Sequence, residues 1–559
     1  MKVGLIGLGA LIWALPLNAQ SAYDPLAPIA QPSPTAVQPP PVAALPPPQV
    51  AYVPRDWRGV FNAIDAGQWA AAQAGIYALP VSVLTPVAKA QLYTARGSPA
   101  VSLSALQALI AEAPDLPQAD QLARMAQTRG STTPLLVVPT RRTNTLGSAP
   151  GRYRAKAVAG DPVADQLREI LVPYVKANDA AGAEAQFLFY APQLTLEARA
   201  ELGQRVAWVY YVLGLDLDAR RVSDTWRQGA AGDWASQAAW ISALASWRLS
   251  DCNSASRAFQ QVGQLATQRA LKSGGYYWAS RAEQMCHRPR SVEPLLRAAA
   301  DSAESFYGLI ALESLGMPTR LPDDSLVAYD PPLEQILNVR RAAELARIGE
   351  PALAEELLRH QAKIGQPGEH HALIQTAKRL DLPAAQLWLA NNGQPGARSD
   401  PADRYPNPKW APLNGWRVDQ ALAYGHIIQE SSFRRTAVST AGAVGLMQVL
   451  PGTAQMVSRS RGVPYSTAAL TDPRYNMEFG QSFIEMMRGS SATAGQLPRV
   501  IASYNAGPLP VGRWAAINDK GDPLLWIESI PYYETRYYVP AVLRNMWVYQ
   551  GLNKEGTPT

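Results

Sequence analysis

Glu430 is the residue whose surroundings most clearly favour chemistry. It follows a stretch in which apolar residues such as Leu422, Ile427 and Ile428 recur at the spacing of a helix with one buried face. Burial disfavours the charged form of a carboxyl group, and the carboxyl end of a helix is the negative end of its dipole. Both effects predict a raised pKa for Glu430. A glutamic acid that stays protonated near neutral pH can protonate the leaving oxygen of a glycosidic bond.

Downstream of Glu430, further segments carry groups that can hold a sugar. Residues 442–448 contain glycines that permit close approach of the backbone, and they end in Gln448, whose amide offers both a donor and an acceptor. Tyr504 and Asn505 come just before a Gly-Pro turn. Residues 528–538 combine aromatics, carboxylates and an arginine in one short stretch. Together these segments predict a carbohydrate-binding site around one acid.

Most of the chain between residues 55 and 392 is rich in Ala, Leu, Gln, Glu and Arg, residue types that favour helices. We therefore expect a mainly helical protein to position these groups. Apolar residues recur there three and four apart, as in the predicted amphipathic helices 57–78, 196–213, 234–249 and 351–360. Helix pairs that cannot bury their apolar faces alone stack into an α-solenoid. We interpret the recurring aromatics of these helices as packing residues and not as a ligand site.

The amino terminus is typical of an export signal. Residues 1–22 comprise Lys2, an apolar run and small residues, which predict a cleavable secretory signal, with an uncleaved membrane anchor as the alternative. Residues 23–54 are rich in Pro and Ala and predict an extended tether. No later run is apolar and long enough to span a bilayer, so we expect an exported protein without an integral span.

Composition excludes some classes of function. The 51 Lys and Arg against 45 Asp and Glu give a formal charge of +6 with no basic block, so nucleic-acid binding does not follow. The mild positive charge suits an anionic polymer such as the cell wall, or only solubility. Cys252 and Cys286 are equally compatible with a disulfide between neighbouring helices and with two free thiols. The histidines show no metal-site spacing, so we predict neither metal nor cofactor, and we interpret His426 as a packed or solvent-touching residue.

The motifs named above resemble those of the soluble lytic murein transglycosylase family. The resemblance rests on residues 430–433, 442–448, 504–507 and 528–536, and residues 305–316 resemble the start of that family's linker domain. Two departures stand out. Arg434 and Arg435 follow Phe433 in a loop where the family commonly has a proline, which predicts a less rigid loop, and Leu450 replaces a common methionine, a change that conserves volume.

The resemblance implies an all-α fold in which an α-solenoid or superhelical ring is followed by a lysozyme-like, α-rich catalytic domain with a small β element. The implied organisation is a signal (1–22), a Pro-rich linker (23–54), a superhelical domain (55–304) with a mobile loop (130–161), a helical linker domain (305–405) and a catalytic domain (406–552).

The resemblance also implies a reaction. Glu430 would first protonate the oxygen between N-acetylmuramic acid and N-acetylglucosamine, and then accept the proton of the muramoyl C6 hydroxyl, which closes a 1,6-anhydro ring without water. Tyr504 and Gln448 would position the sugar, and Glu534 would support Tyr504 from behind. The implied substrate-binding residues are Ser431, Ser439, Met447, Gln448, Tyr504, Asn505 and Glu534.

Two alternatives stay open at this point. A hydrolase of the same fold would release reducing ends in place of anhydro ends. A glycan-binding scaffold of a wall-synthesis complex would not cleave at all. In each case the expected partner is the peptidoglycan glycan strand in the periplasm, and the Pro-rich segment is a possible contact to cell-wall machinery.

Overall fold

A computed structural model describes residues 52–319, 321 and 331–555 of the 559-residue chain. The predicted signal and nearly all of the predicted Pro-rich linker lie outside the described residues. The predicted all-α class is confirmed, because helices dominate the described part and strands are limited to two residues each. None of the helices in the described ranges is both long and apolar enough to cross a membrane.

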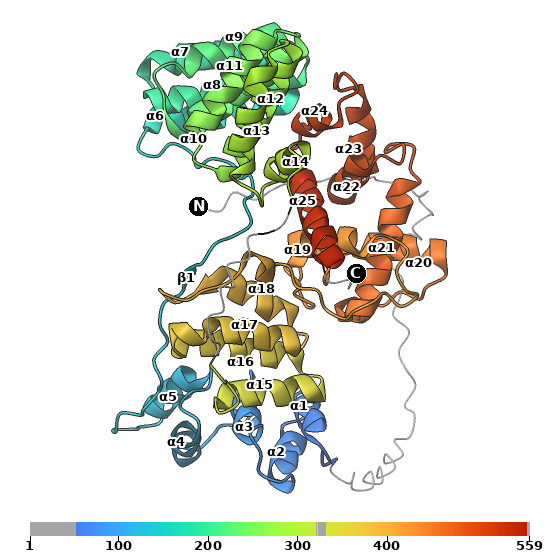
Figure 1. The fold of residues 1–559 in the computed structure, drawn as a ribbon. Coiled ribbons are helices and arrows are strands. Elements are labelled where there is room, and N and C mark those ends of the chain that lie inside the picture. The colour runs from blue at the N-terminus through green and yellow to red at the C-terminus, as the bar shows by residue number, and fades with distance from the viewer. Residues whose placement is uncertain (1–51, 320, 322–330, 556–559) are drawn as a thin grey trace, which may run out of the picture. The chain divides into compact units, whose positions relative to one another are not determined.

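One hydrophobic core joins two stretches that are far apart in the sequence. Its helices are α1 (Trp57–Asp65), α2 (Trp69–Ala78), α3 (Thr85–Thr94), α4 (Leu103–Glu112), α5 (Ala119–Thr128), α15 (Leu337–Ile348), α16 (Pro351–Ile364), α17 (His370–Arg379) and α18 (Pro383–Asn391). Buried residues between Val60 and Ala126 pack with buried residues between Leu333 and Leu389, which Figure 1 shows as blue helices beside yellow ones. The first helices of the predicted superhelical domain therefore share a core with the predicted linker domain.

The second core contains the rest of the helices and the candidate site. They are α6 (Pro162–Ala177), α7 (Ala180–Tyr190), α8 (Leu196–Val212), α9 (Asp216–Trp226), α10 (Gly232–Arg248), α11 (Cys252–Leu265), α12 (Arg269–Met285), α13 (Val292–Ala300), α14 (Phe306–Ser314), α19 (Gln420–Ser431), α20 (Pro451–Arg461), α21 (Pro473–Arg488), α22 (Leu497–Ala506), α23 (Pro508–Arg513), α24 (Pro523–Glu528) and α25 (Tyr533–Glu555). Short 3-10 turns are η1 (Ala191–Gln193), η2 (Pro289–Ser291), η3 (Pro367–Glu369), η4 (Pro401–Arg404), η5 (Ala468–Thr471) and η6 (Trp514–Ala516).

Helices α6 to α14 stack in sequence order, and their aromatics fill the space between neighbours. The rings of Trp247 and Trp278 meet edge to face with centroids 5.1 Å apart, and Trp278 stacks on Phe259 at 5.6 Å. These aromatics lie between helices, as the packing interpretation requires. Cys252 and Cys286 form a disulfide that joins the start of α11 to the end of α12, so the disulfide alternative is confirmed and the free-thiol alternative is wrong.

Local sequence explains where one predicted helix is divided. The periodicity predicts a continuous helix over residues 57–78, but the structure has α1 and α2 with a break between them. Gly67 adopts a left-handed backbone with φ of 69° at this break, a conformation that glycine adopts without penalty. Apolar periodicity passes over such a break because both helices bury the same kind of face.

The segment of residues 130–161 contains no helix, as its composition predicts, but contacts hold it along its length. Strand β1 (Asn144–Thr145) pairs antiparallel with β2 (Asn392–Gly393) next to α18. Further along, the amide of Val158 donates to Glu201 on α8, and Trp234 on α10 donates to the carbonyl of Lys156. The mobility expected of this segment stays a prediction, and these contacts favour a defined path.

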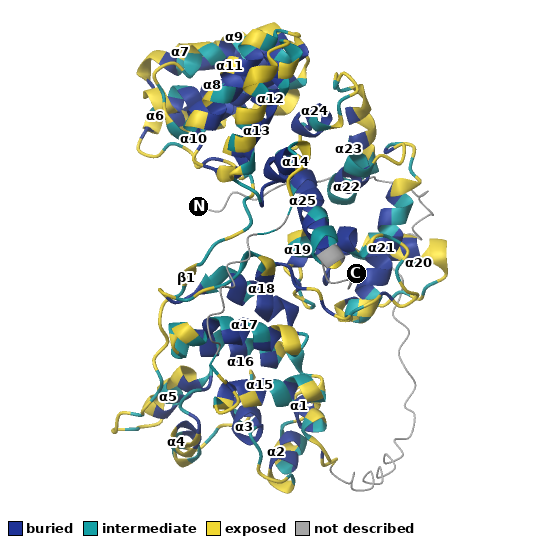
Figure 2. Ribbon diagram, viewed as in Figure 1, coloured by how far each residue is buried: buried dark blue, intermediate teal, exposed yellow. Residues whose placement is uncertain are grey.

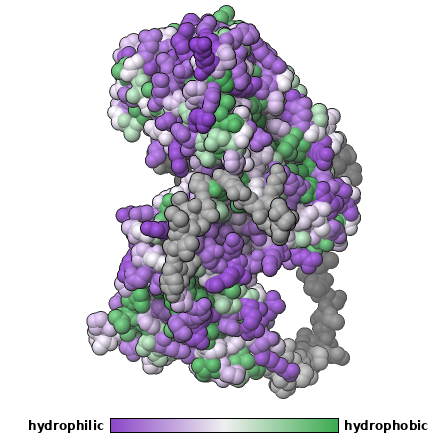
Figure 3. All heavy atoms as spheres, in the orientation of Figure 1, coloured by the Kyte–Doolittle hydropathy of each residue, from purple (hydrophilic) through white to green (hydrophobic). Residues whose placement is uncertain are grey.

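The distribution of burial follows the helix faces. Figure 2 shows buried residues where helices meet and exposed residues on the outer faces. On the face drawn in Figure 3 most of the surface is hydrophilic, with apolar residues scattered between. This pattern is what amphipathic helices produce when one side of each is packed.

Candidate functional site

Glu430 lies in the last turn of α19, as predicted. Asp419 caps the start of this helix by accepting from the amide of Ala421. At the other end, Ser432 and Phe433 both adopt left-handed backbones, with φ of 52° and 63°. The Arg434 guanidinium donates to the carbonyl of Ser431 at 3.0 Å, so this arginine holds the end of the helix in a loop where the resemblance led us to expect less rigidity.

The environment of Glu430 favours its protonated form. The residue is half-buried, and burial raises its pKa to about 7, helped by the nearby negative charge of Glu534. The Tyr538 hydroxyl opposes this effect, because it donates to Glu430 Oε1 at 2.5 Å and a hydrogen bond to a carboxylate lowers the pKa. Burial is the main cause, and the sequence predicted both its presence and its direction.

Tyr538 also contacts His426, which is fully buried one turn before Glu430. The hydroxyl oxygen of Tyr538 lies 2.7 Å from His426 Nδ1. Burial lowers the pKa of His426 to about 3, so its ring is neutral at physiological pH. Of the two alternatives for His426, burial supports a packed residue and not a solvent-touching one. Its hydrogen bond to Tyr538 was not predicted.

The loop of residues 442–448 is fixed by Asn476 of α21. The buried Asn476 side chain accepts from the amide of Met447 at 2.8 Å and donates to the carbonyl of Val444 at 2.9 Å. Backbone bridges pair Val444 with Val438 and with Val449, and these bridges are the small β element of this region. Gly445 has φ of 80°, and a Cβ there would lie 2.2 Å from Asn476 Nδ2, so only glycine fits.

Four residues between 431 and 448 were predicted to bind sugar, and most of their side chains contact the surrounding protein backbone. Ser431 is buried and donates to Ile427 within α19. Ser439 accepts from the amide of Ala443 and closes a turn. The Met447 side chain is fully buried. The Gln448 amide nitrogen donates to the carbonyls of Ala437 and Gly445. The substrate contacts predicted for Ser431 and Met447 stay predictions, and the burial of both side chains does not favour them.

Tyr504 and Asn505 lie at the end of α22, beside α19 and α25. The Tyr504 hydroxyl donates to the carbonyl of Met447 at 2.7 Å, and its ring packs on His426 with centroids 4.5 Å apart. Glu534 was predicted to support Tyr504, but its carboxylate accepts a hydrogen bond from the Asn505 side chain, at 3.4 Å. Thr535 donates to Asn505 Oδ1 at 2.6 Å. The expected pairing of Glu534 with Tyr504 is therefore replaced by one with its neighbour.

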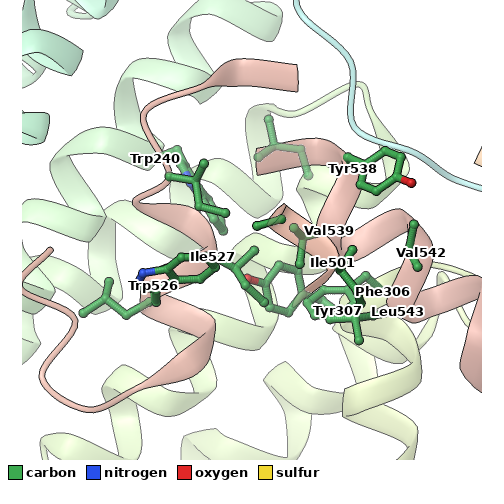
Figure 4. Close-up of a cluster of buried hydrophobic side chains, with 14 of the residues drawn as sticks. Trp240, Phe306, Tyr307, Ile501, Trp526, Ile527, Tyr538, Val539, Val542 and Leu543 are labelled. Atoms are coloured by element: carbon green, nitrogen blue, oxygen red, sulfur yellow. The ribbon is translucent and has the colours of Figure 1, made fainter. Parts of the chain in front are cut away.

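Residues 528–536 tie this site to α8, α14 and the non-helical segment. Glu528 is fully buried, and it pairs with Arg152 at 2.5 Å and accepts from Tyr307 at 2.7 Å. The Arg536 guanidinium lies 3.6 Å from the ring centroid of Trp208, so Arg536 stacks on an aromatic ring of α8. Figure 4 shows the apolar cluster around this junction, with Tyr538 at its margin.

One group of described residues has side chains close enough to hold a metal ion. His371, Asp400 and Asp403 place ligand atoms within 4.8 Å of one another, although their spacing gave no such indication. Asp400 and Asp403 also form the capping box of η4, and Gln375 donates to Asp403. Capping therefore accounts for both carboxylates without an ion.

Two residues that shape the site were not predicted from the sequence. Tyr538 lies 108 positions after its partner Glu430, and Asn476 lies 29 positions after Met447. Neither spacing is periodic. Tyr538 could have been suspected only from its position, because it lies one helical turn after Glu534 in the aromatic-rich stretch of residues 528–538.

The comparisons with known proteins find similarity to lytic murein transglycosylases. Residues 411–527 match the Transglycosylase SLT domain family. The soluble lytic murein transglycosylase of Escherichia coli (strain K12) is 36% identical over 136 residues, which cover 23% of this chain and 20% of that protein. The Salmonella typhimurium protein of the same name is 30% identical over 285 residues, 48% of this chain and 42% of that protein. The matched region thus spans less than half the length of either relative.

A solved structure extends the likeness to the fold of nearly the whole chain. An inactive mutant of the lytic transglycosylase Slt from Pseudomonas aeruginosa superposes with a TM-score of 0.54, covering 89% of this chain and 86% of that one at 19% identity. This likeness concerns the fold, including the long helical part before the site. Residues 411–527 thus carry a Transglycosylase SLT domain, and the chain is similar in sequence to soluble lytic murein transglycosylases.

Proposed function

We propose that this protein is a peptidoglycan lytic transglycosylase, with Glu430 as the acid and base of the reaction. The observation that carries the proposal is a half-buried glutamic acid at a helix end, whose pKa burial raises to about 7. A carboxyl group with this pKa can exist in both forms near neutral pH, which one residue needs if it is to give a proton and later take one.

The proposed reaction has two proton transfers through Glu430. The protonated carboxyl donates to the oxygen between N-acetylmuramic acid and N-acetylglucosamine while the bond from C1 to that oxygen breaks. The carboxylate then accepts the proton of the C6 hydroxyl as the C6 oxygen bonds to C1. Glu430 ends protonated again, and no water is consumed. The N-acetyl group of the muramoyl sugar can stabilise the positive charge between these steps.

Several groups around Glu430 fit this chemistry. The Tyr538 hydroxyl holds Oε1, which leaves Oε2 as the other carboxyl oxygen for the substrate. The Gln448 nitrogen is engaged with backbone carbonyls, so the group it offers a sugar is its amide oxygen. Tyr504 acts through the carbonyl of Met447, which it holds in place. Asn505 and the exposed Glu534 remain candidates for polar contacts with the sugar.

The substrate and the compartment belong to the same proposal. The proposed substrate is the glycan strand of peptidoglycan, and the proposed site of action is the periplasm. The disulfide between Cys252 and Cys286 supports an oxidising compartment. Contact of the Pro-rich segment with cell-wall machinery is a further proposal, supported only by its composition.

Digestion of purified sacculi tests the reaction. We expect wild-type protein to release fragments with 1,6-anhydromuramoyl ends, which mass spectrometry separates from reducing ends by the mass of one water. Glu430→Gln should reduce the rate by a factor of roughly a thousand or more, because its amide cannot donate or accept the required proton. The exposed carboxylate of Glu534 provides the control Glu534→Gln, which should retain much more activity. Reducing ends would favour a hydrolase, and undiminished cleavage by Glu430→Gln would remove Glu430 from the reaction.

A further inference from the structure

A chain of hydrogen bonds leads from Glu430 into the core of the domain. The Tyr538 hydroxyl lies 2.5 Å from Glu430 Oε1 and 2.7 Å from His426 Nδ1. His426 and Glu430 lie four residues apart on α19, hence on one face, and Tyr538 comes from α25, which packs against α19. His426 is fully buried and Tyr538 is 8% exposed, so solvent reaches this chain mainly at Glu430.

The number of protons limits how this chain can be arranged. A phenol has one proton to donate, so Tyr538 cannot donate to both of its neighbours. If Tyr538 donates to Glu430, His426 must carry its proton on Nδ1 and donate it to the Tyr538 oxygen. If Tyr538 donates to His426 instead, the histidine proton must sit on Nε2, and Glu430 Oε1 loses its donor.

Burial separates these two arrangements. Within the described part of the chain, His426 Nε2 is buried and has no hydrogen-bond partner. With the proton on Nδ1, the His426 and Tyr538 donors both find acceptors, and only a lone pair at Nε2 is left over. With the proton on Nε2, a buried N–H lacks an acceptor and the carboxylate lacks a donor. A buried donor without an acceptor is costly and rare, so the first arrangement is favoured.

We propose that His426 is a positioning residue: as the neutral Nδ1–H tautomer it commits the Tyr538 proton to Glu430 Oε1, so that Oε2 carries the proton that Glu430 transfers. The bond that His426 donates also polarises the Tyr538 hydroxyl and strengthens its hydrogen bond to the carboxylate. This role rests on the proposed function of Glu430 and adds a residue that acts only through Tyr538.

The surrounding groups leave Tyr538 as the donor to Glu430. From α25, Tyr538 and Glu534 face the carboxyl, and from α22 Tyr504 does so; His426 comes from α19 itself. The Tyr504 hydroxyl is already bound to the Met447 carbonyl at 2.7 Å, so it does not compete. The Glu534 charge raises the pKa of Glu430, whereas the Tyr538 bond lowers it. A weaker Tyr538 bond therefore raises the pKa of Glu430.

Nitrogen NMR of the full-length protein tests the tautomer without any activity. The imidazole nitrogens are labelled with ¹⁵N, and the His426 signals are assigned by their loss in His426→Asn. We expect Nδ1 to give the signal of a protonated ring nitrogen and Nε2 that of an unprotonated one. The opposite pattern, or two protonated nitrogens at neutral pH, would overturn the proposal.

The pH dependence of kcat/KM on sacculi tests the consequence for Glu430. Activity is lost as Glu430 deprotonates, so the alkaline limb of the profile follows its pKa. His426→Leu removes the donor and should move this limb upward by roughly half a pH unit. His426→Asn places an amide nitrogen close to the position of Nδ1 and should return the limb to its wild-type place. His360→Leu, a histidine change on α16, is the control that should leave the limb unmoved.

The outcomes separate this proposal from the one it rests on. An alkaline limb that stays in place in His426→Leu, or moves equally in His426→Asn, would overturn the positioning role while leaving the transglycosylase reaction intact. If wild-type protein cleaves no glycan, the proposed function fails, and the nitrogen signals still decide the tautomer. If His426→Leu does not fold, the wild-type spectrum and the His426→Asn profile still give the answer.

Discussion

At the scale of single residues, the site keeps an acid where its charge is unfavourable. Burial raises the pKa of Glu430 to about 7, and the negative charge of Glu534 adds to this shift. The Tyr538 hydroxyl provides one charge-assisted hydrogen bond to Oε1, which limits the shift without removing it. Such a residue is useful for proton transfer and at the same time destabilises the folded protein whenever it is ionised.

This conflict predicts that Glu430→Gln is more stable than wild type at alkaline pH. The folded-state pKa of Glu430 is raised from 4.5 to about 7, so wild-type protein has its full stability below pH 4.5 and loses part of it as the pH rises through 7. Glutamine stays neutral throughout. We expect a gain in the free energy of unfolding of roughly 3 kcal/mol at pH 8 and almost none at pH 4.

Chemical denaturation at both pH values measures this difference. Glu334→Gln, at an exposed position, is the matched control and should show no such pH-dependent gain. An equal gain for Glu430→Gln at pH 4 and pH 8 would mean that packing and not ionisation causes it.

The sequence predicted the acid but only part of its surroundings. Glu430 could be found because its helix shows apolar periodicity and its burial follows from that pattern. Tyr538 could not, because its distance from Glu430 depends on how α19 and α25 pack. The same packing places Glu534 against Asn505 and not against Tyr504. Local patterns therefore predict which residues are buried, whereas pairs between distant helices require the structure.

At the scale of elements, the glycine-containing loop is held from behind by a helix. Asn476 on α21 bonds to the backbone of Val444 and Met447, and the Met447 carbonyl in turn holds Tyr504. From the sequence, we expected the glycines to let the backbone come close to a bound sugar. At Gly445 the close approach is toward Asn476 and the carbonyl of Leu470, so this glycine serves the loop's own packing.

A matched pair of glycines tests this explanation. Gly445 and Gly442 both have φ of 80°, but a Cβ at Gly442 meets nothing within 4 Å whereas one at Gly445 clashes with Asn476 and Leu470. Alanine at Gly442 should cost about 1–2 kcal/mol of stability from backbone strain alone. Alanine at Gly445 should cost at least about 2 kcal/mol more, from overpacking. Thermal unfolding of both variants measures the difference, and equal losses would contradict the proposed clash.

The element scale also shows where periodicity is insufficient. A helical pattern over residues 57–78 did not reveal the break at Gly67, because the apolar spacing continues on both sides. The composition of residues 130–161 correctly predicted the absence of helix. It carried no signal for the pairing of β1 with β2, since two-residue strands are too short to show alternation.

At the scale of the whole molecule, the non-helical segment connects the candidate site to the stacked helices. Arg152 from this segment pairs with the buried Glu528. Its guanidinium lies 4.8 Å from the ring centroid of Trp240 and 4.9 Å from that of Tyr537. Glu528 also accepts from Tyr307 of α14. The buried carboxylate of Glu528 thus connects the segment of residues 130–161 and helix α14 to residues 528–538, which contain Tyr538.

Removing the arginine should therefore affect more than one part. Arg152→Met leaves Glu528 buried without its countercharge, which should cost about 3–5 kcal/mol of stability. We also expect faster cleavage of residues 130–161 in limited proteolysis, because the segment loses its anchor. Arg154→Met, at an exposed position two residues away, is the control and should change stability by less than about 0.5 kcal/mol. Similar behaviour of the two variants would show that the ion pair does not anchor the segment.

The composition of the first core has a consequence for the order in which the chain folds. Helices α1 to α5 bury their apolar faces against residues 333–389, which are made only after more than 200 further residues. Because the chain emerges amino terminus first, α1 to α5 lack these partners while α6 to α14 can already pack on one another. We therefore expect the amino-terminal helices to fold late, and an exposed apolar intermediate to form first.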